Sequence, residues 1–185
     1  AILASAAFNS RVTFEDVYTE GITKITATDI EYAKEMGCTI KLLGVAKDTP
    51  EGIEARVHPM LIDSNHPLAT VNDSYNAVFV HGDAVGDTMF YGRGAGELPT
   101  ASAVVGDIFE VVRNMKADCC GRVGCTCYKT LPVKAMADTH NRYFLRLQVE
   151  DRCGVLAELL EHFAKYQASV AQIMQKESKR PDTAE

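Results

Sequence analysis

Three glycines on alternate positions mark the segment that most constrains the fold of this chain. Gly92, Gly94 and Gly96 follow the apolar residues 88–91 and precede a long helical pattern that starts near Pro99. This order predicts a strand, a tight turn and a helix N-terminus. Because glycine has no Cβ, the backbone N–H groups of the turn are open to a phosphate, amide or carboxyl group. The turn is predicted to touch a small molecule, and a plain connecting turn is the commoner alternative.

Two pairs of strands are predicted in the first 115 residues. Residues 39–46 and 53–58 are rich in strand formers and flank a turn with proline and glycine, which predicts a β-hairpin. Residues 76–80 and 88–91 are joined by a turn with two glycines and two aspartates, which predicts a second pair.

Two helices are predicted to accompany these strands. Thr28 and Glu31 have the spacing of a capping box, which predicts a helix over residues 28–36. From Thr100, apolar residues recur at spacings of three and four, which predicts a helix that lies on the sheet and ends near residue 114. Residues 1–115 are therefore predicted to form an α+β domain, with a mixed, largely antiparallel sheet of at least four strands covered by helices.

Residues 116–140 are predicted to be a flexible linker that contains cysteines. Cys119, Cys120, Cys125 and Cys127 fall within nine residues, a spacing that fits no standard zinc site. No metal is expected, although a compact thiolate site is a less favoured alternative. An intracellular chain keeps such thiols reduced.

Residues 141–185 predict a partial ferredoxin-like βαβ unit. Residues 142–149 alternate as a strand, residues 155–163 place their leucines on one helix face, and residues 170–175 predict a second strand. Such a unit is too small to bury both of its faces, so a missing second half or a partner chain is implied.

Composition excludes several classes of function. The net charge of −6 and the scattered basic residues argue against nucleic-acid binding. No apolar run reaches the length of a membrane-spanning helix, and residues 1–8 lack the basic start of a signal peptide, so a cytoplasmic location is expected. The chain opens without methionine inside an apparent helix and closes on a polar turn at 178–185, so both ends are expected to be artificial.

The chain resembles homoserine dehydrogenase over about residues 1–114. The resemblance is carried by many motifs, among them Phe14-Glu15-Asp16-Val17-Tyr18, Arg56-Val57-His58-Pro59, His66-Pro67-Leu68-Ala69, Asn76-Ala77-Val78-Phe79-Val80 and Tyr91-Gly92-Arg93-Gly94-Ala95-Gly96-Glu97-Leu98-Pro99-Thr100. Residues 141–185 are similar to the first half of an ACT domain, the amino-acid-binding regulatory module at the C-terminus of many bacterial members.

The resemblance implies hydride transfer between NAD or NADP and the carbon that is aldehyde in aspartate semialdehyde and alcohol in homoserine. This reaction belongs to threonine, methionine and isoleucine biosynthesis. In the family, a dinucleotide-binding domain, a substrate-binding acidic residue and a D-x-x-x-K-L stretch with the acid/base lysine precede a segment like residues 1–5. The chain is therefore expected to hold no catalytic residue and to be inactive alone. The loop Gly94-Ala95-Gly96 is expected to contact the nicotinamide end of the cofactor.

The resemblance also implies a homo-oligomer, expected to be a dimer, and an amino-acid effector such as threonine. In an ACT module the effector lies at the first strand–helix turn, here Asp151-Arg152-Cys153-Gly154. Asp151 is expected to accept the ammonium group, while the amides after Gly154 hold the carboxylate. Cys153 stands where the family commonly has proline.

Other polar residues receive structural interpretations. Asp29 and Lys34 are expected to be exposed helix charges, and His58 and His66 are expected to anchor loops. A role as proton shuttle is the alternative for His58, His66 and His81, and Glu20-Gly21 either lines a cleft or closes a turn. Two other functions remain open: a non-catalytic amino-acid-binding regulatory module, and a purely structural oligomerisation piece.

Overall fold

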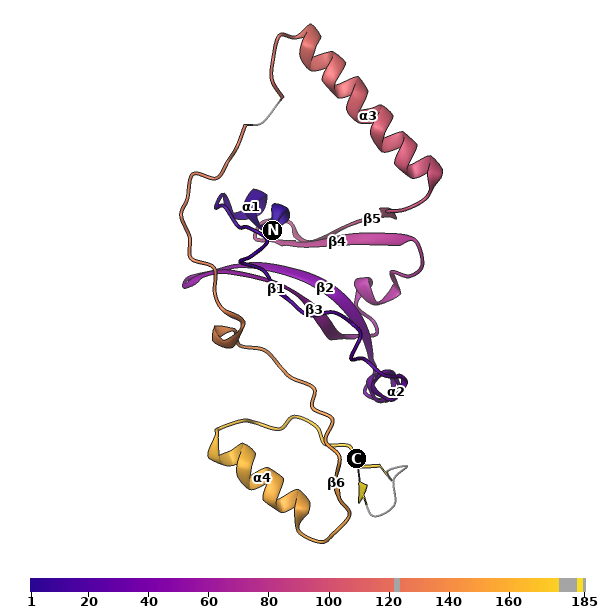
Figure 1. Ribbon diagram of the computed structural model, residues 1–185, viewed down its shortest axis with the longest axis vertical. Coiled ribbons are helices and arrows are strands. Elements are labelled where there is room, and N and C mark those ends of the chain that lie inside the picture. The colour runs from indigo at the N-terminus through magenta and orange to yellow at the C-terminus, as the bar shows by residue number, and fades with distance from the viewer. Residues whose placement is uncertain (122–123, 177–182, 185) are drawn as a thin grey trace. The chain divides into compact units, whose positions relative to one another are not determined.

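The computed structural model describes residues 1–121, 124–176 and 183–184, and the chain divides into two compact units, Ala1–His140 and Asn141–Glu185. The first unit contains, in chain order, α1 (Ile2–Phe8), β1 (Tyr18–Thr19), α2 (Ala27–Glu35), β2 (Cys38–Thr49), β3 (Gly52–Asp63), the 3₁₀ turn η1 (Pro67–Thr70), β4 (Tyr75–Gly82), β5 (Gly86–Arg93), α3 (Glu97–Lys116) and the 3₁₀ turn η2 (Met136–Asp138) (Figure 1). In the described residues, no helix is long and apolar enough to cross a membrane.

The main sheet has the strand order β1-β3-β2. β2 and β3 form a long antiparallel hairpin in one unbroken register, from the pair Cys38 and Asp63 to the pair Thr49 and Gly52. This confirms the first predicted hairpin and extends both of its strands. β1 runs parallel to β3 on the opposite edge from β2, so β3 is the central strand.

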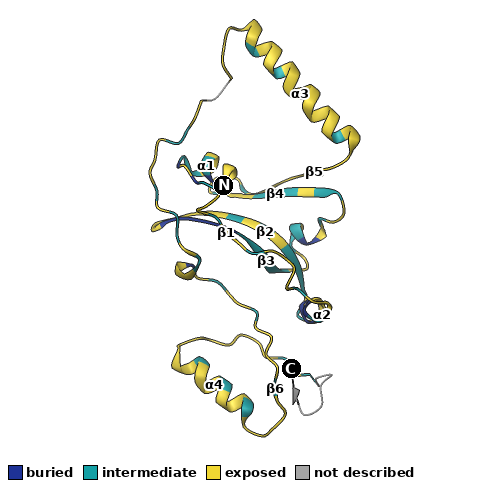
Figure 2. Cartoon of the chain, in the orientation of Figure 1, coloured by how far each residue is buried: buried dark blue, intermediate teal, exposed yellow. Residues whose placement is uncertain are grey.

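The hydrophobic core of the first unit lies between α1 and one face of β3. Its buried residues come from α1, the segment after it and β3, and the half-buried residues around them include two from a segment much later in the chain. The buried members are Ala4, Val12, Ile53 and Ala55, and the half-buried ones are Phe8, Val17, Leu131 and Val133. Figure 2 shows the dark, buried stretches concentrated on β3 and α2.

Helix α2 starts at Ala27, one residue before the helix predicted from the capping box of Thr28 and Glu31. Its N-cap is Thr26, whose side chain accepts a hydrogen bond from the backbone N–H of Asp29, while the Asp29 carboxylate accepts from the N–H of Thr26 at 2.7 Å. The reciprocal box therefore forms two residues upstream with a shorter acidic side chain. The predicted helix is confirmed, but the predicted cap is wrong.

β4 and β5 form a second antiparallel hairpin, as predicted, but this hairpin is a separate sheet. The predicted α+β class with largely antiparallel strands is confirmed, but the strands of the first unit form two small sheets and not the single sheet of at least four strands that was predicted. The segment between β3 and β4 carries η1, and Lys41 of β2 reaches it through side-chain hydrogen bonds to the Val71 carbonyl and Asn72 at 2.6 and 2.8 Å. The segment between β3 and β4 is thus connected to β2 by side-chain hydrogen bonds and not by a backbone ladder.

Helix α3 begins at Glu97, slightly before the predicted start, and none of its residues is buried. The expectation that this helix is packed on the sheet is wrong for this chain. Its apolar residues have no partner surface within the described part of the first unit that buries them (Figure 2).

Residues 128–139, hereafter the strap, return to the main sheet. Lys129 N–H donates to the Asn9 carbonyl at 2.9 Å, and Leu131 N–H donates to the Ser10 hydroxyl at 3.0 Å. Further along, Val133 lies parallel to Ile53 as an isolated bridge. The strap is thus bound to the first unit, contrary to the flexible linker expected for this part of residues 116–140.

The second unit contains β6 (Val149–Glu150), α4 (Val155–Lys165) and β7 (Thr183–Ala184), with β6 and β7 antiparallel. The predicted helix is confirmed, but the strand predicted at 142–149 is reduced to its end, and residues 170–175 form no strand. The polar turn predicted at 178–185 falls largely outside the described residues.

Candidate functional site

The glycine turn leaves the β4–β5 ladder at Gly94 and enters α3 at Gly96. The N–H of Gly94 donates to the Ser74 carbonyl at 3.1 Å, which is one rung beyond the paired residues Tyr75 and Arg93. Gly96 is the N-cap of α3, and its carbonyl accepts from the N–H of Thr100 at 3.1 Å. Residues 94–96 are all exposed, as a ligand-contacting turn requires.

Two positions of the turn require glycine, each for a different reason. Gly96 has φ 121° and ψ 155°, a backbone conformation that L side chains rarely adopt. At Gly94 the constraint is space, because a Cβ there would clash with the side-chain amide nitrogen of Asn76 and lie 2.7 Å from its Cγ. By contrast, a Cβ at Gly92 would meet nothing within 4 Å.

Aromatic stacking supports the strands that carry the turn. The rings of Tyr75 and Tyr91 stack with centroids 4.8 Å apart and an interplanar angle of 3°. The Arg93 guanidinium lies 4.8 Å from the centroid of the Tyr75 ring and donates to the Ser74 hydroxyl at 3.2 Å. These contacts hold the end of β5 against the start of β4, directly before the turn.

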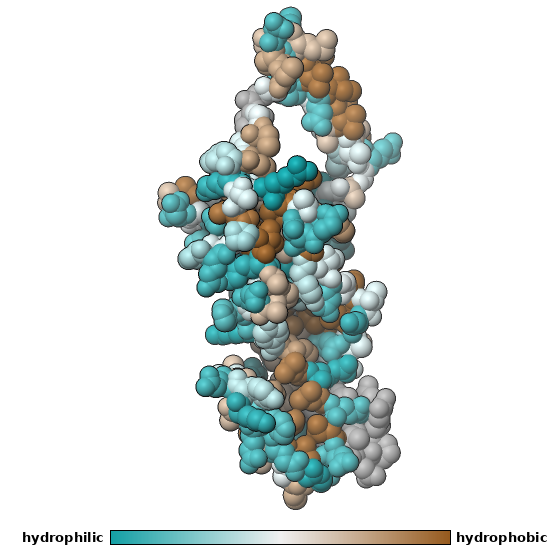
Figure 3. Space-filling model, turned by 60° about the vertical axis from the view of Figure 1, so that its left-hand side comes forward, coloured by the Kyte–Doolittle hydropathy of each residue, from teal (hydrophilic) through white to brown (hydrophobic). Residues whose placement is uncertain are grey.

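A shallow hollow follows the turn along the first half of α3. It is lined by Gly96, Glu97, Thr100, Ala101, Val104 and Val105. The apolar side chains of α3 continue beyond it and are exposed at Val104, Val105, Ile108, Phe109, Val111, Val112 and Met115. Figure 3 shows apolar side chains along this helix at the top of the view. Exposed backbone at Ala95 and Gly96 next to an apolar surface suits a ligand with both polar and flat apolar parts.

The second candidate site is the turn before α4. Gly154 is the N-cap, with φ 93°, and no side chain caps the helix. Arg152 spans the turn, because its guanidinium donates to Glu150 at 3.2 Å and to both carboxylate oxygens of Glu158 at 2.9 Å. The hydrogen bonds from Arg152 lower the pKa of the Glu158 carboxyl. Asp151 is exposed beside this ion pair.

The other predicted polar residues have mostly structural surroundings. Asp29 is buried in the capping box, so its predicted exposure is wrong, whereas Lys34 is exposed. His66 caps η1 by accepting from the Leu68 N–H at 3.1 Å, which confirms it as a loop anchor. His81 contacts Asp87 at 2.6 Å on the exposed end of the second hairpin.

Glu20 binds back to the main sheet. Its N–H donates to the Val57 carbonyl at 2.8 Å, and its carboxylate accepts from the Tyr18 hydroxyl at 3.1 Å. These bonds are those of a residue that closes a turn after a short strand.

A charged row on β3 was not predicted. Glu54, Arg56 and His58 share one face of the strand, since side chains two residues apart point the same way. Arg56 is only 2% exposed; it forms an ion pair with Glu54 and donates through Nε to His58 at 3.1 Å. His58 is thus part of this row in β3 and not the anchor of a loop.

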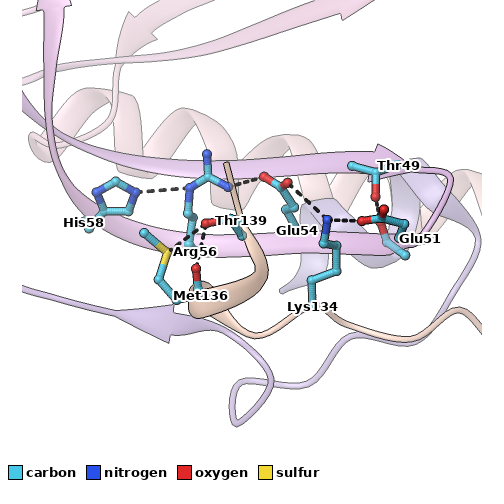
Figure 4. Close-up of polar contacts among 9 residues, drawn as sticks. Thr49, Glu51, Glu54, Arg56, His58, Lys134, Met136 and Thr139 are labelled. Carbon is cyan, nitrogen blue, oxygen red and sulfur yellow. Dashed lines mark hydrogen bonds and ion pairs between the residues drawn. The ribbon is translucent and has the colours of Figure 1, made fainter. Parts of the chain in front are cut away.

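Lys134 of the strap completes the row (Figure 4). Its ammonium group lies 2.7 Å from Glu51 and 4.0 Å from Glu54. The hydrogen bond to Glu51 raises the pKa of Lys134 and lowers that of the Glu51 carboxyl. The alternation of polar residues at 54, 56 and 58 indicates that one face of the strand is polar. It does not indicate Lys134, which lies far along the chain and pairs with this face.

The cysteines are all free thiols in the described residues. Hydrogen bonds from the backbone and side chain of Cys127 lower the pKa of Cys125, and the same thiol contact raises that of Cys127. Within residues 1–121, 124–176 and 183–184, no group of three or more His, Cys, Asp or Glu side chains is arranged to hold a metal ion.

The fold and the turn together define a class: an α+β unit with an exposed glycine turn at a helix N-terminus. Comparison with known proteins gives the family. A sequence profile of homoserine dehydrogenase matches residues 1–109, more than half of the chain, and the chain belongs to this family.

Individual relatives agree with this assignment. The chain is 50% identical over 183 residues to the homoserine dehydrogenase of Corynebacterium glutamicum, covering 96% of this chain and 41% of that protein. A homoserine dehydrogenase structure from Thiobacillus denitrificans matches with TM-score 0.83 and 38% identity over 99% of this chain and 42% of that one. One from S. aureus matches with TM-score 0.65 and 31% identity over 99% of this chain and 44% of that one. The chain thus spans about two fifths of its relatives' length.

Proposed function

We propose that this chain is the substrate and dimerisation part of a homoserine dehydrogenase, followed by the first half of an amino-acid-binding regulatory module. The proposed division is 1–115 for the former, 116–140 for the connection and 141–185 for the latter. The whole enzyme interconverts aspartate semialdehyde and homoserine in the cytoplasm, within threonine, methionine and isoleucine biosynthesis. The observation that carries the proposal is the exposed turn Gly94-Ala95-Gly96 in a chain of this family.

The turn fits a nicotinamide dinucleotide. When bound, NAD or NADP supplies or accepts the hydride at its nicotinamide ring. The residues that meet this end of the cofactor are Gly94, Ala95 and Gly96, whose backbone is exposed and bare of bulky side chains. Their part is to bind and orient; proton transfer belongs to residues of the parent enzyme outside this chain.

The exposed apolar side chains of α3 support an assembled parent enzyme. A surface of this kind is commonly covered by another domain or subunit. We propose a dimer, with further parts of the enzyme beside α3.

The second unit is proposed to bind an amino-acid effector such as threonine at Asp151 and Gly154. The uncapped amides at the α4 N-terminus favour a carboxylate, and exposed Asp151 favours an ammonium group. Arg152 is already paired with Glu150 and Glu158, so it stabilises the turn and leaves these two roles to its neighbours.

Activity assays test the main proposal. The parent enzyme is expected to oxidise NADPH in the presence of aspartate semialdehyde, whereas this chain alone is expected to be inactive. Turnover by the isolated chain, or none by the parent enzyme, contradicts the proposal. Gly96→Ala in the parent enzyme is expected to raise the KM for NADPH, with Gly92→Ala as the matched control on an unconstrained glycine.

A non-catalytic sensor is the second candidate, and the uncapped turn at Gly154 favours it. Calorimetric titration with threonine, combined with the activity assay of the parent enzyme, distinguishes the two functions, because a regulated dehydrogenase also binds threonine but a sensor catalyses no turnover. A sensor binds threonine in the absence of any dinucleotide domain, with an affinity that Asp151→Ala weakens. Absence of heat with the isolated chain and binding by the parent enzyme supports the dehydrogenase.

A further inference from the structure

Asn76 lies beside the glycine turn on the open face of the β4–β5 hairpin. It pairs with Gly92 across the ladder, and the rung between Ser74 and Gly94 follows two residues further along. Residues 74, 76, 92 and 94 therefore share one face of the hairpin. Asn76 is the diagonal neighbour of Gly94, and both are exposed.

The Asn76 amide occupies the space that any side chain at position 94 requires. A Cβ on Gly94 would clash with the Asn76 amide nitrogen, while the Asn76 Cβ would remain 3.4 Å away, close to an ordinary contact. Among the described residues, the Asn76 side chain makes no hydrogen bond, so its contact with Gly94 is one of shape.

This contact occurs where the backbone changes direction. Gly94 makes the last hydrogen bond of the ladder through its N–H, and Gly96 is already the cap of α3. Only Ala95 stands between them, so the dihedral angles at Gly94 decide where the amides of Ala95 and Gly96 point. A side chain packed against Gly94 restricts those angles.

We propose that Asn76 is a positioning residue of the homoserine dehydrogenase reaction: its amide fills the notch beside Gly94 and fixes the turn that meets the dinucleotide. This inference rests on the proposed function of the turn. It also explains why position 94 requires glycine: the amide of Asn76 occupies the space of a side chain. This reason differs from close approach of the cofactor to the backbone.

A double-mutant cycle in the parent enzyme tests the proposal. Gly94→Ala is expected to raise the KM for NADPH by about tenfold and to lower the unfolding temperature, because the new methyl group meets the amide. Asn76→Ala is expected to raise the same KM less and to leave the unfolding temperature unchanged, because it removes no hydrogen bond. The double variant is expected to match Asn76→Ala in both quantities, since removal of the amide makes room for the methyl group.

The KM for aspartate semialdehyde is the internal control and is expected to stay constant in all three variants. Asn65→Ala is the matched control for loss of an exposed amide; it lies in the turn after β3 and is expected to change neither KM. Removal of a purely structural residue changes the unfolding temperature alone, so the selective rise in the KM for NADPH identifies positioning.

Three results overturn the inference. A double variant as impaired as Gly94→Ala shows that the cofactor, and not Asn76, requires glycine. An unchanged KM for NADPH in Asn76→Ala shows that the amide does not position the turn. Equal unfolding temperatures in all four proteins show that the two residues do not interlock. An inactive wild-type parent enzyme instead refutes the proposed function, while the unfolding temperatures still decide whether the interlock exists.

Discussion

The first unit contains two antiparallel β-hairpins that differ in how far the rest of the chain covers them. The β2–β3 hairpin is covered by α1, β1 and the strap, and it contributes the buried residues Ile53, Ala55 and Arg56. The β4–β5 hairpin has no buried residue, and Phe90 on its open face is 69% exposed. It also carries the glycine turn. The covered hairpin contributes to the core, while the open one leaves an uncovered surface beside the turn that we propose meets the cofactor.

The largest expected effect comes from a buried charge in the covered hairpin. Arg56→Met leaves the carboxylate of Glu54 without its nearest partner in a buried position. The loss in free energy of unfolding is expected to be about 3–5 kcal/mol. Chemical denaturation of the chain measures it. Arg93→Met in the open hairpin is the control, expected to cost about 1 kcal/mol or less because this arginine is exposed; equal losses contradict the comparison.

Removal of core volume comes next. Ile53 is fully buried between α1 and the strap, and Ile53→Ala is expected to cost roughly 3 kcal/mol through lost burial and the cavity left behind. Val80→Ala in the open hairpin removes a side chain that is 43% exposed and is expected to cost less than about 1 kcal/mol. Urea titrations of both variants give the two values, and a Val80→Ala loss as large as that of Ile53→Ala refutes the difference in burial.

Substitution of one glycine in each hairpin is expected to show the same difference in stability, with smaller losses. Gly52 has φ 136°, and a Cβ there would strike the carbonyl of Pro132 in the strap. Gly52→Ala is expected to destabilise the unit by about 1–3 kcal/mol. Gly92→Ala, where a Cβ meets nothing, is expected to be neutral or slightly stabilising. Thermal unfolding of the two variants tests this, and a harmless Gly52→Ala argues that the strap does not lie against the hairpin.

The smallest effect concerns the exposed end of the charged row. The hydrogen bond to Lys134 lowers the pKa of Glu51. The stability that this ion pair contributes is therefore present above the ordinary carboxylate pKa of about 4.3, and it is lost as pH falls through the lower pKa of the folded state. The pKa of Lys134 is raised, so the same contribution is lost at the alkaline end as pH rises through that raised value.

Hydrogen exchange measures this effect locally. The N–H groups of Ile53 and Lys134 bind the strap to β3, with lengths of 2.8 Å to the carbonyls of Pro132 and Ile53. Their protection, corrected for intrinsic exchange rates, is expected to fall in acid relative to neutral pH. Glu51→Gln is expected to flatten this dependence, and a pH response that survives the substitution assigns it to another group.

The hairpins were predictable because their signals are local. Alternating side chains and short turns with glycine or proline determine β2 to β5 within about 12 residues of each other. The glycine turn at 94–96 was predictable for the same reason, because the change of period from strand to helix surrounds it. Gly96 has the positive φ that its residue type permits.

The strap and the charged row depend on contacts that no local pattern encodes. Val133 meets Ile53 and Lys134 meets Glu54 across a long stretch of chain, and residues 128–139 have no periodicity of their own. The cap of α2 was misplaced because Thr26 and Thr28 both stand three residues before an acid, and the buried position of Asp29 decides between them. Alternation at 142–149 and 170–175 predicted strands that are absent over most of these residues, because a strand depends on pairing that alternation alone does not encode.

The outer edge of β3 has a practical consequence. Ile53 and Val57 lie four positions apart, an even step, so their backbone groups point to the same edge of β3. There the strap hydrogen-bonds to Ile53 and Glu20 hydrogen-bonds to Val57. Two pieces of chain therefore cover this edge from Ile53 to Val57 and protect that part of it against intermolecular pairing. A shortened chain that stops before Tyr128 would uncover half of that edge and self-associate, whereas one that stops after Thr139 would keep it closed. Expression boundaries belong beyond Thr139.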